Sequence, residues 1–357
     1  MKGVDVVAHI LKEEKVDYLF CFPANKLIDS AAKVGIRPIM TRTERTLVNM
    51  ADGFSRISNG NQIGVAVVQS GPGSENAFAG VAQAFADSIP ILMLPGGVSR
   101  RSGDIPTHFS SVKNYAHVTK WVAQANFADR LPNMLRRAYS LLRSGHPAPV
   151  MIEIPTDVGE EEVSDYAYTP PKPIKSIADP VNVKNAVDSL LMAKRPILFI
   201  GQGSLFAEAS SSLIRLAEML QIPVMTTMGG KGAFPENHPL SVGASGLTGS
   251  RVVKHFLSKA DLILGVGSSM SKNTFAPQVP SNIPIIHNTS SETDINKDCV
   301  ATVALLGDAR LVTDQLIDEI VSRIGVDGRA ENVTLLQEIA EVKADWLSEW
   351  MPRLTSN

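Results

Sequence analysis

IGVAVVQSGPGSENAFAGVAQAFADSIPILMLPG, residues 63–96, combines two short apolar runs with a helical pattern between them. The runs at 63–69 and 90–96 are continuous rather than alternating, as expected of parallel strands that are covered on both faces. The segment between them starts at a turn rich in glycine and proline, which lets the chain leave one strand and enter a helix. This strand–helix–strand unit predicts a parallel, doubly wound sheet of the α/β class.

Similar apolar runs recur along the whole chain and fall into two series. Helical patterns separate the runs, so each series predicts a parallel sheet of its own. Between the series lie an acidic patch at 159–165 and the proline-rich segment TPPKPIKSIADP at 169–180, a composition typical of a domain boundary. The further runs are 17–22, 37–40 and 149–155 in the first series, and 196–201, 223–230, 260–267, 284–288 and 300–307 in the second.

We therefore expect an α/β protein of two doubly wound parallel-sheet domains joined by a Pro-rich linker, with a C-terminal helix. The expected boundaries are 1–168 for the first domain, 169–182 for the linker, 183–330 for the second domain and 331–357 for the helix. One stripe of that helix carries Leu335, Ile339, Val342, Trp346 and Trp350. The stripe either packs on its own domain or forms a docking surface for another domain or chain.

Composition excludes several classes of protein. The 357 residues include 34 Lys+Arg and 36 Asp+Glu, a formal net charge of −2, which leaves no basic excess for nucleic acid. No apolar run approaches the ~20 residues of a membrane span, and the N-terminus lacks the pattern of a signal peptide. Two cysteines make no disulfide framework, and neither HExxH nor CxxC occurs. We expect a cytoplasmic protein without a nucleic-acid or membrane partner, and no metal bound by this chain alone.

Glu44 is the first candidate for chemistry. It follows the apolar run that ends at Met40, and open α/β sheets bind ligands where their strands end. On the helix predicted next, Glu44 heads an apolar stripe, and a carboxyl in such surroundings suits proton transfer. The spacing Thr41-Arg42-Thr43-Glu44 equally fits a capping box, in which the glutamate only closes the start of the helix. Spacing alone favours the cap, because capping boxes far outnumber catalytic carboxylates.

Two loops are expected beside Glu44. Ser70-Gly71-Pro72-Gly73 joins a strand to a helix, and its glycines allow a sharp turn and close approach to a ligand. Phe22-Pro23-Ala24-Asn25 follows another strand and is expected to lie near it. The structural alternative for the glycine turn is a tight connection with no ligand.

The glycine pairs of the second domain are weaker signals. Gly201-Gln202-Gly203 and Gly265-Val266-Gly267 both end apolar runs, but Phe206 and Met270 stand where G-x-G-x-x-G needs its last glycine. Either pair borders a nucleotide or simply ends a strand. The structural interpretation is favoured, because glycine is common at strand ends.

Taken together, these segments resemble the thiamine-diphosphate enzymes of the acetolactate synthase and 2-oxo acid decarboxylase superfamily. The resemblance covers the pyrimidine-binding and middle domains, about residues 1–325, and its motifs occur in the family's order. They are FPANKLID, TRTERTLVNMADGFSR, QSGPGSENAFAGVAQAFADSIPIL, MTTMGGKGAFPENHPLSVG and IIHNTSSETDINKD.

The resemblance implies a role for each matching residue. Glu44 corresponds to the catalytic glutamate, which hydrogen-bonds the N1′ nitrogen of thiamine diphosphate and so promotes loss of the proton on the thiazolium C2 carbon. The resemblance therefore favours the cofactor role for Glu44 over the cap. The remaining residues expected at the pyrimidine end are Phe22, Pro23, Ala24, Asn25, Gly71, Pro72, Gly73 and Asn76.

The chain also departs from the family pattern. No Gly-Asp-Gly occurs, so the resemblance implies that a separate diphosphate-binding subunit holds the diphosphate and Mg²⁺. A homodimer or heterotetramer is expected, because the family's pyrimidine domains pair. Ala24 stands where glycine is usual, and Phe109-Ser110 where the synthases have Phe-Gln. Thr289 and Ser291 replace two carboxylates of the flavin-binding synthases, which makes FAD doubtful.

The expected function is that of the pyrimidine-domain subunit of a split enzyme of the acetolactate synthase type. Such an enzyme decarboxylates a 2-oxo acid and transfers the acyl unit to a carbonyl acceptor. The alternatives are a simple 2-oxo acid decarboxylase subunit, or a non-catalytic nucleotide-binding or scaffold paralogue.

Overall fold

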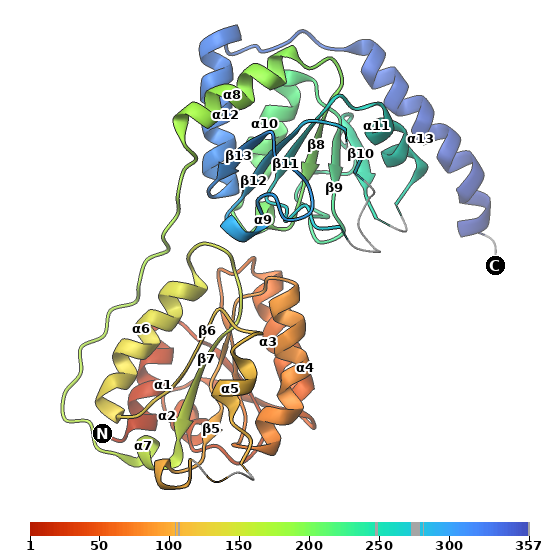
Figure 1. Cartoon of the computed structure of the whole chain (residues 1–357). Helices are drawn as coiled ribbons and strands as arrows, with labels where there is room; N and C mark the ends of the chain where they lie inside the picture. The colour runs from red at the N-terminus through yellow and green to blue at the C-terminus, as the bar shows by residue number, and fades with distance from the viewer. Residues whose placement is uncertain (104, 106–107, 247–248, 273–278, 281, 356–357) are drawn as a thin grey trace. The chain divides into compact units, whose positions relative to one another are not determined.

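The computed structural model describes residues 1–103, 105, 108–246, 249–272, 279–280 and 282–355. The chain forms two compact units, Met1–Ile174 and Lys175–Asn357 (Figure 1). Both are α/β units with parallel sheets, which confirms the predicted fold class. None of the helices in the described part of the chain has the length and apolar character needed to cross a membrane.

The sheet of unit 1 has the order β2-β1-β3-β4-β7-β5, with β6 paired to β7. Its core strands are almost entirely buried, because helices cover both faces of the sheet. The strands are β1 (Tyr18–Cys21), β2 (Arg37–Met40), β3 (Gly64–Val67), β4 (Ile91–Met93), β5 (Gly96–Gly97), β6 (Trp121–Gln124) and β7 (Val150–Pro155).

Two layers of helices enclose this sheet (Figure 1). On one face lie α1 (Gly3–Glu13), α2 (Leu27–Lys33) and α6 (Leu131–Leu142), and on the other α3 (Glu44–Ile57), α4 (Pro72–Ala86) and α5 (Ser111–Tyr115). The short helices are α7 (Thr156–Glu160), η1 (Arg100–Ser102) and η2 (Ala128–Arg130). Leu47, Val48 and Ala51 of α3 are fully buried, so the apolar stripe that follows Glu44 faces the core.

The sheet of unit 2 has the order β10-β9-β8-β11-β12-β13, in which the chain crosses over after its third strand. The strands are β8 (Pro196–Ile200), β9 (Val224–Thr226), β10 (Ser241–Ala244), β11 (Leu262–Val266), β12 (Ile285–Thr289) and β13 (Val303–Leu306). The helices are α8 (Pro180–Met192), α9 (Gly203–Phe206), α10 (Ser210–Leu220), η3 (Glu292–Asp294), α11 (Arg251–Lys259), α12 (Ala309–Ile324) and α13 (Val333–Leu354).

Helix α13 folds back on its own unit. Ile339 is 1% exposed, and Leu335, Val342 and Trp346 pack against the core beside α11 and β10. The stripe expected from the sequence therefore packs on unit 2, with Ile339 buried and Leu335, Val342 and Trp346 half-buried. Its last member, Trp350, is 38% exposed and stacks at a tilt on Trp346, with ring centroids 6.5 Å apart.

The segment 168–178 contacts unit 1 in its first part and unit 2 in its second part. Before the division, the Tyr168 hydroxyl donates to the Glu14 carboxylate, and Ile174 N donates to Ser144 Oγ at 3.0 Å. After it, Lys175 Nζ lies 3.2 Å from Asp308 Oδ2, and Ala178 N donates to Gln315 Oε1 at 2.9 Å. The proline-rich stretch is thus fastened to folded structure along its length.

Candidate active site at the carboxyl edge of the first sheet

Three loops meet where the central strands of unit 1 end. After β1 the chain continues to β2 on one side, and it later returns to place β3 on the other side of β1. The carboxyl ends of β1 and β3 therefore flank the topological switch point, where open α/β sheets bind ligands. The residues that follow these strands, and the start of α3 after β2, lie at this edge.

Glu44 is the first residue of α3, and it is 6% exposed. The N-cap is Thr43, whose Oγ1 accepts a hydrogen bond from Thr46 N at 3.3 Å. Thr41 Oγ1 instead donates to the Thr43 carbonyl at 2.8 Å. The capping-box interpretation, with Thr41 as N-cap and Glu44 in the third position, is therefore wrong. The helix starts two residues later, and its cap does not use the Glu44 carboxylate.

Asn76 of α4 is the hydrogen-bond donor to Glu44. Its Nδ2 lies 3.3 Å from Glu44 Oε2. The contact needs α3 and α4 to approach closely, and Gly80 allows this approach. A Cβ at Gly80 would lie 2.8 Å from Val48 Cβ, which is closer than such atoms can pack. Gly80 is a site residue that the sequence patterns did not single out, because its role depends on a contact between two helices.

Gly71 and Gly73 are glycines for different reasons. Gly71 is the N-cap of α4 with φ 65° and ψ −112°, a backbone conformation closed to residues with a Cβ. A Cβ at Gly71 would meet no atom within 4 Å, so the space beside it is open. A Cβ at Gly73 would lie 2.7 Å from Gln69 Cγ. Packing within the turn therefore explains Gly73 without a ligand, whereas Gly71 borders open space.

Asn25 fastens the loop after β1 to the end of β3. Its Nδ2 donates to the Val68 carbonyl at 3.0 Å, and its Oδ1 accepts from Leu27 N at 3.0 Å. Both the amide nitrogen and the amide oxygen of Asn25 therefore form hydrogen bonds within the protein, and these bonds hold the loop in place. The neighbouring Ala24 has φ 75°, in the left-handed region that favours glycine.

The nearby loop around 109–115 adds a buried polar cluster. The Tyr115 hydroxyl donates to the Ser74 carbonyl at 2.6 Å, and Ser111 Oγ donates to Ser74 Oγ at 3.1 Å. Burial raises the pKa of Tyr115, so the phenol stays neutral and anchors the first turn of α4. Ser110 is the N-cap of α5, with its hydroxyl accepting from Lys113 N at 3.4 Å. Sequence patterns gave no signal for the Ser74–Tyr115 contact.

The site therefore consists of a buried carboxyl inside an open rim. Pro23, Ala24, Pro72 and Asn76 are exposed, whereas Glu44 is buried and Phe22 is half-buried. Within the described part of the chain, Asn76 is the one hydrogen-bond donor to Glu44. A buried carboxyl with one donor can accept a hydrogen bond from a ligand ring nitrogen and exchange a proton with it. No three His, Cys, Asp or Glu side chains among the described residues gather as a metal site.

The glycine turns of unit 2 are filled by the protein's own backbone. Gly203 N donates to the Gly267 carbonyl at 2.8 Å, and a Cβ at Gly201 would lie 2.3 Å from the same oxygen. These glycines let the turns after the neighbouring strands β8 and β11 approach closely, in agreement with the structural interpretation. At the neighbouring strand end, Thr289 Oγ1 donates to Asp294 Oδ2 at 3.1 Å and accepts from Ser291 N at 3.1 Å.

Comparison with known proteins identifies both units. The N-terminal TPP binding domain of thiamine pyrophosphate enzymes matches residues 1–124, and their central domain matches residues 183–316. The probable acetolactate synthase large subunit of Methanocaldococcus jannaschii is 31% identical over 340 residues, which cover 90% of this chain and 56% of that protein.

Two bacterial relatives give the same result. The acetolactate synthase large subunit of Haemophilus influenzae is 30% identical over 96% of this chain and 62% of its own length. The isozyme 3 large subunit of Escherichia coli is 28% identical over 99% of this chain and 61% of its own length. The chain thus spans about three fifths of the length of these relatives. It belongs to the thiamine pyrophosphate enzymes and carries their N-terminal TPP-binding domain and their central domain.

Proposed function

We propose that unit 1 forms the pyrimidine half of a thiamine-diphosphate site in an enzyme of the acetolactate synthase type. The observation that carries this proposal is the buried Glu44, which receives a hydrogen bond from Asn76 at the switch point of the sheet. The relatives described above are acetolactate synthase large subunits, which supports the same reaction class. The substrate is then a 2-oxo acid, which loses carbon dioxide and donates its acyl unit to a carbonyl acceptor.

The residues at this edge fit the pyrimidine ring of the cofactor. Phe22, Pro23 and Pro72 offer apolar surface, and the open space beside Gly71 leaves room for a ligand at the start of α4. Ala24, Asn25 and Gly73 shape the two loops, with the Asn25 amide joining them. When bound, thiamine diphosphate supplies the electron sink that stabilises the carbon from which carbon dioxide leaves.

The protein's own contribution is to hold and move a proton. The Glu44 carboxyl binds a ring nitrogen of the cofactor and exchanges a proton with it. Asn76 orients that carboxyl through its hydrogen bond, and the close packing of α3 and α4 at Gly80 fixes the distance between them. The low exposure of Glu44 limits the access of water to the carboxyl, which strengthens these interactions.

We further propose that a second chain completes the site by binding the diphosphate and Mg²⁺. The exposed rim of Pro23, Pro72 and Asn76 supports this, because a rim around a buried acid can be covered by a partner. The family resemblance supports it too, since pyrimidine and diphosphate domains meet across subunits. The assembly is then a homodimer of this chain or a heterotetramer with the diphosphate-binding chain.

The test compares two charge-neutralising variants in the assembled enzyme. Glu44→Gln should lower pyruvate turnover by roughly 10²- to 10⁴-fold, the usual contribution of a positioned acid or base. Glu75→Gln removes a carboxylate from the exposed side of α4 next to Asn76 and should keep turnover within about twofold. Equal turnover by the two variants would show that the Glu44 carboxylate takes no part in the reaction.

The same assay separates the remaining alternatives. Acetolactate as the product from pyruvate identifies a carboligase, whereas acetaldehyde alone identifies a simple decarboxylase. Full turnover by this chain alone, with thiamine diphosphate and Mg²⁺ but no other protein, would contradict the need for a second chain. An assembly that forms but is equally inactive with and without Glu44→Gln would indicate a scaffold.

A further inference from the structure

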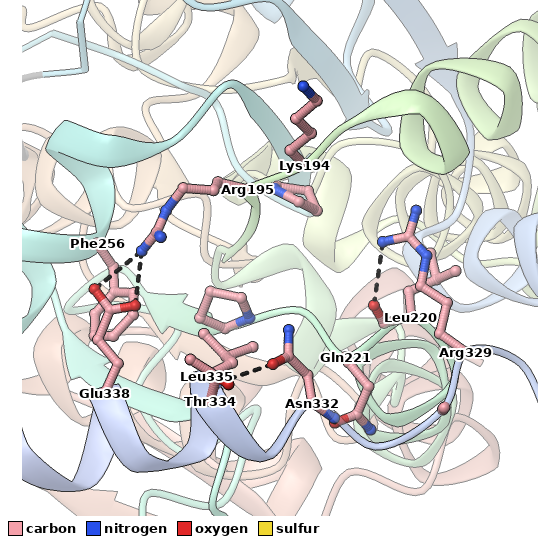
Figure 2. A pocket seen from close by; sticks show the side chains of 13 residues that line it. Lys194, Arg195, Leu220, Gln221, Phe256, Arg329, Asn332, Thr334, Leu335 and Glu338 are labelled. Atoms are coloured by element: carbon pink, nitrogen blue, oxygen red, sulfur yellow. Dashed lines mark hydrogen bonds and ion pairs between the residues drawn. The ribbon is translucent and has the colours of Figure 1, made fainter.

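Unit 2 contains a cavity of about 170 Å³ at the amino edge of its sheet, opposite to the glycine turns (Figure 2). Four segments far apart in the sequence line it: the start of β8, the end of α10 with the turn to β9, Phe256 of α11, and the start of α13 with the residues before it. The volume is smaller than the roughly 300 Å³ at which pockets for drug-sized ligands begin. It suits a molecule of a few heavy atoms.

The cavity combines an apolar floor with a positively charged rim. Pro196, Pro223, Leu335 and Phe256 contribute apolar surface. The charged residues that line it are the cations Lys194, Arg195 and Arg329 and the single carboxylate Glu338, which gives a net charge of 3 − 1 = +2. This balance excludes a cation as the preferred ligand.

Glu338 is already saturated by cations and nearby donors. Arg195 Nη2 donates to both of its oxygens, at 3.0 and 2.8 Å, and Lys259 Nζ lies 2.9 Å from Oε1. His255 Nε2 also lies 2.7 Å from Oε1. Partial burial alone would raise the pKa of Glu338, but the hydrogen bonds from His255, Lys259 and Arg195 lower it to about 2. The carboxylate therefore stays ionised, and its charge is compensated within the protein by Arg195 and Lys259.

Arg329 and Lys194 keep their positive charge available. Arg329 Nη2 donates to the Leu190 and Leu191 carbonyls at 3.0 and 2.9 Å, which fixes the guanidinium without neutralising it. Neither Arg329 nor Lys194 forms an ion pair with a carboxylate within the described ranges. Asp261 accepts the backbone N–H of Lys194 at 2.8 Å, not its ammonium group. The Lys194 side chain is exposed and extends from the rim in Figure 2, so it can turn onto a ligand.

Asn332 adds a neutral donor at the start of α13. Its Oδ1 accepts from Leu335 N at 3.0 Å and caps the helix. With the oxygen used in this way, the amide nitrogen remains available as a donor, and Figure 2 shows it on the side of Asn332 away from that bond. The positive end of a 22-residue helix lies here as well. All of these groups favour negative charge on a ligand.

We propose that this cavity binds a small organic anion, with its carboxylate between Arg329, Lys194 and Asn332 and a short aliphatic body on the floor formed by Pro196, Pro223 and Leu335. An apolar floor distinguishes this ligand class from inorganic phosphate, which would leave that surface uncovered. The site lies in unit 2 and uses no residue of the Glu44 site, so it stands or falls independently of the proposed function.

Butyrate is the probe, and butyramide, with nearly the same shape but no charge, is its control. The pure chain without cofactor is titrated by saturation-transfer NMR. Butyrate should bind saturably with a dissociation constant of about 1 mM, as good ligand efficiency for six heavy atoms allows. Butyramide should bind at least about tenfold more weakly, because it lacks the charge. Inorganic phosphate has no carbon-bound proton to observe, so it is added as a competitor, and it should displace butyrate only at concentrations at least about tenfold above the butyrate dissociation constant, because it lacks the aliphatic body. Phosphate that binds as well as butyrate, or no saturable butyrate binding, would overturn the assignment.

Two pairs of variants locate the binding. Ala330 lines the cavity and is exposed, so Ala330→Trp should fill the space and abolish butyrate binding. Ala340→Trp, on the exposed side of α13 and outside the lining, should leave binding unchanged. Lys194→Gln should weaken binding roughly threefold, whereas Lys184→Gln on α8 should not. Butyrate binding that survives Ala330→Trp, or is lost equally in Ala340→Trp, would contradict this location.

Discussion

Gly71→Ala tests the turn that presents Asn76 to Glu44. The glycine has φ 65° and ψ −112°, and an alanine there would hold a conformation that costs about 1–3 kcal/mol. Loss of flexibility in the unfolded chain offsets about 0.4–1 kcal/mol of this cost. No atom lies within 4 Å of the added Cβ, so steric clash contributes nothing. The net destabilisation of unit 1 should be about 1–2 kcal/mol.

Gly53→Ala is the matched control. Gly53 lies inside α3 without a positive φ, and its added Cβ would likewise meet no atom within 4 Å. Alanine in a helix interior is favoured over glycine by roughly 0.5–1 kcal/mol. The same chemical change should therefore stabilise the protein at position 53 and destabilise it at position 71.

Hydrogen exchange followed by mass spectrometry measures both effects. Peptides covering β3 and β4 report the opening free energy of unit 1 separately from unit 2, which a single melting curve cannot do. In the assembled enzyme, Gly71→Ala should also lower turnover, because the start of α4 and Asn76 move with the turn. A Gly71→Ala protein as stable as wild type, or stabilised like Gly53→Ala, would refute this explanation of the turn.

Three further variants test other parts of the structure. Arg143→Met should destabilise unit 1 by roughly 3–5 kcal/mol in urea unfolding, because Arg143 Nη1 pairs at 2.6 Å with a Glu14 side chain that is fully buried. Adding Glu14→Gln to this variant removes the unpaired charge and should recover most of the lost stability. Ala24→Gly should stabilise unit 1 by about 0.5–1 kcal/mol, because removing the backbone strain of an alanine at φ 75° outweighs the extra conformational entropy of glycine in the unfolded chain. An unchanged unfolding midpoint would show that the alanine is not strained. Since the pKa of Glu338 falls from 4.5 to about 2 on folding, its contribution to stability is present above about pH 4.5 and lost as the pH falls toward 2. The stability difference between wild type and Glu338→Gln should narrow over that range, and a constant difference would contradict the ion-pair cluster.

The sheets could be predicted from the sequence because their central strands are buried on both faces and form continuous apolar runs, and the half-exposed edge strands β2 and β13 also lie in apolar runs. Each of the ten apolar runs contains a strand, from β1 at Tyr18–Cys21 to β13 at Val303–Leu306. The two-residue β5 at the end of the run at 90–96 was not predicted as a separate strand, and no run covers β6 or β10. Both lie at the edge of a sheet, where WVAQ is only half-buried and SVGA contains a glycine, so neither forms a continuous apolar run.

The start of α3 shows where local patterns stop being informative. Thr41 and Thr43 are both good N-cap residues, and only Thr41 forms a capping box with Glu44. The folded chain uses Thr43, so that Glu44 begins the helix and its side chain turns toward α4. Spacing had favoured the capping box, which the structure contradicts, whereas the cofactor role that the family resemblance implies for Glu44 stays a prediction.

Contacts between distant segments could not be predicted. Asn76 reaches Glu44 because Gly80 lets two helices approach, and nothing in the sequence around either residue signals that distance. The cavity of unit 2 is a similar case, because its lining combines residues from 194–196, 220–223 and 329–338. The local pattern in each of these stretches describes only the end of one helix or strand.

The central claim is that the Glu44 carboxyl transfers a proton at the thiamine-diphosphate site. Its most direct measurement is the rate at which the C2 hydrogen of bound thiamine diphosphate exchanges with deuterium from solvent in the assembled enzyme, followed by quenched NMR. We predict that Glu44→Gln slows this exchange by roughly 10²- to 10⁴-fold while the cofactor remains bound, and that Glu75→Gln leaves the rate at the wild-type value. Exchange at the wild-type rate in a Glu44→Gln enzyme that still holds its cofactor would contradict the claim.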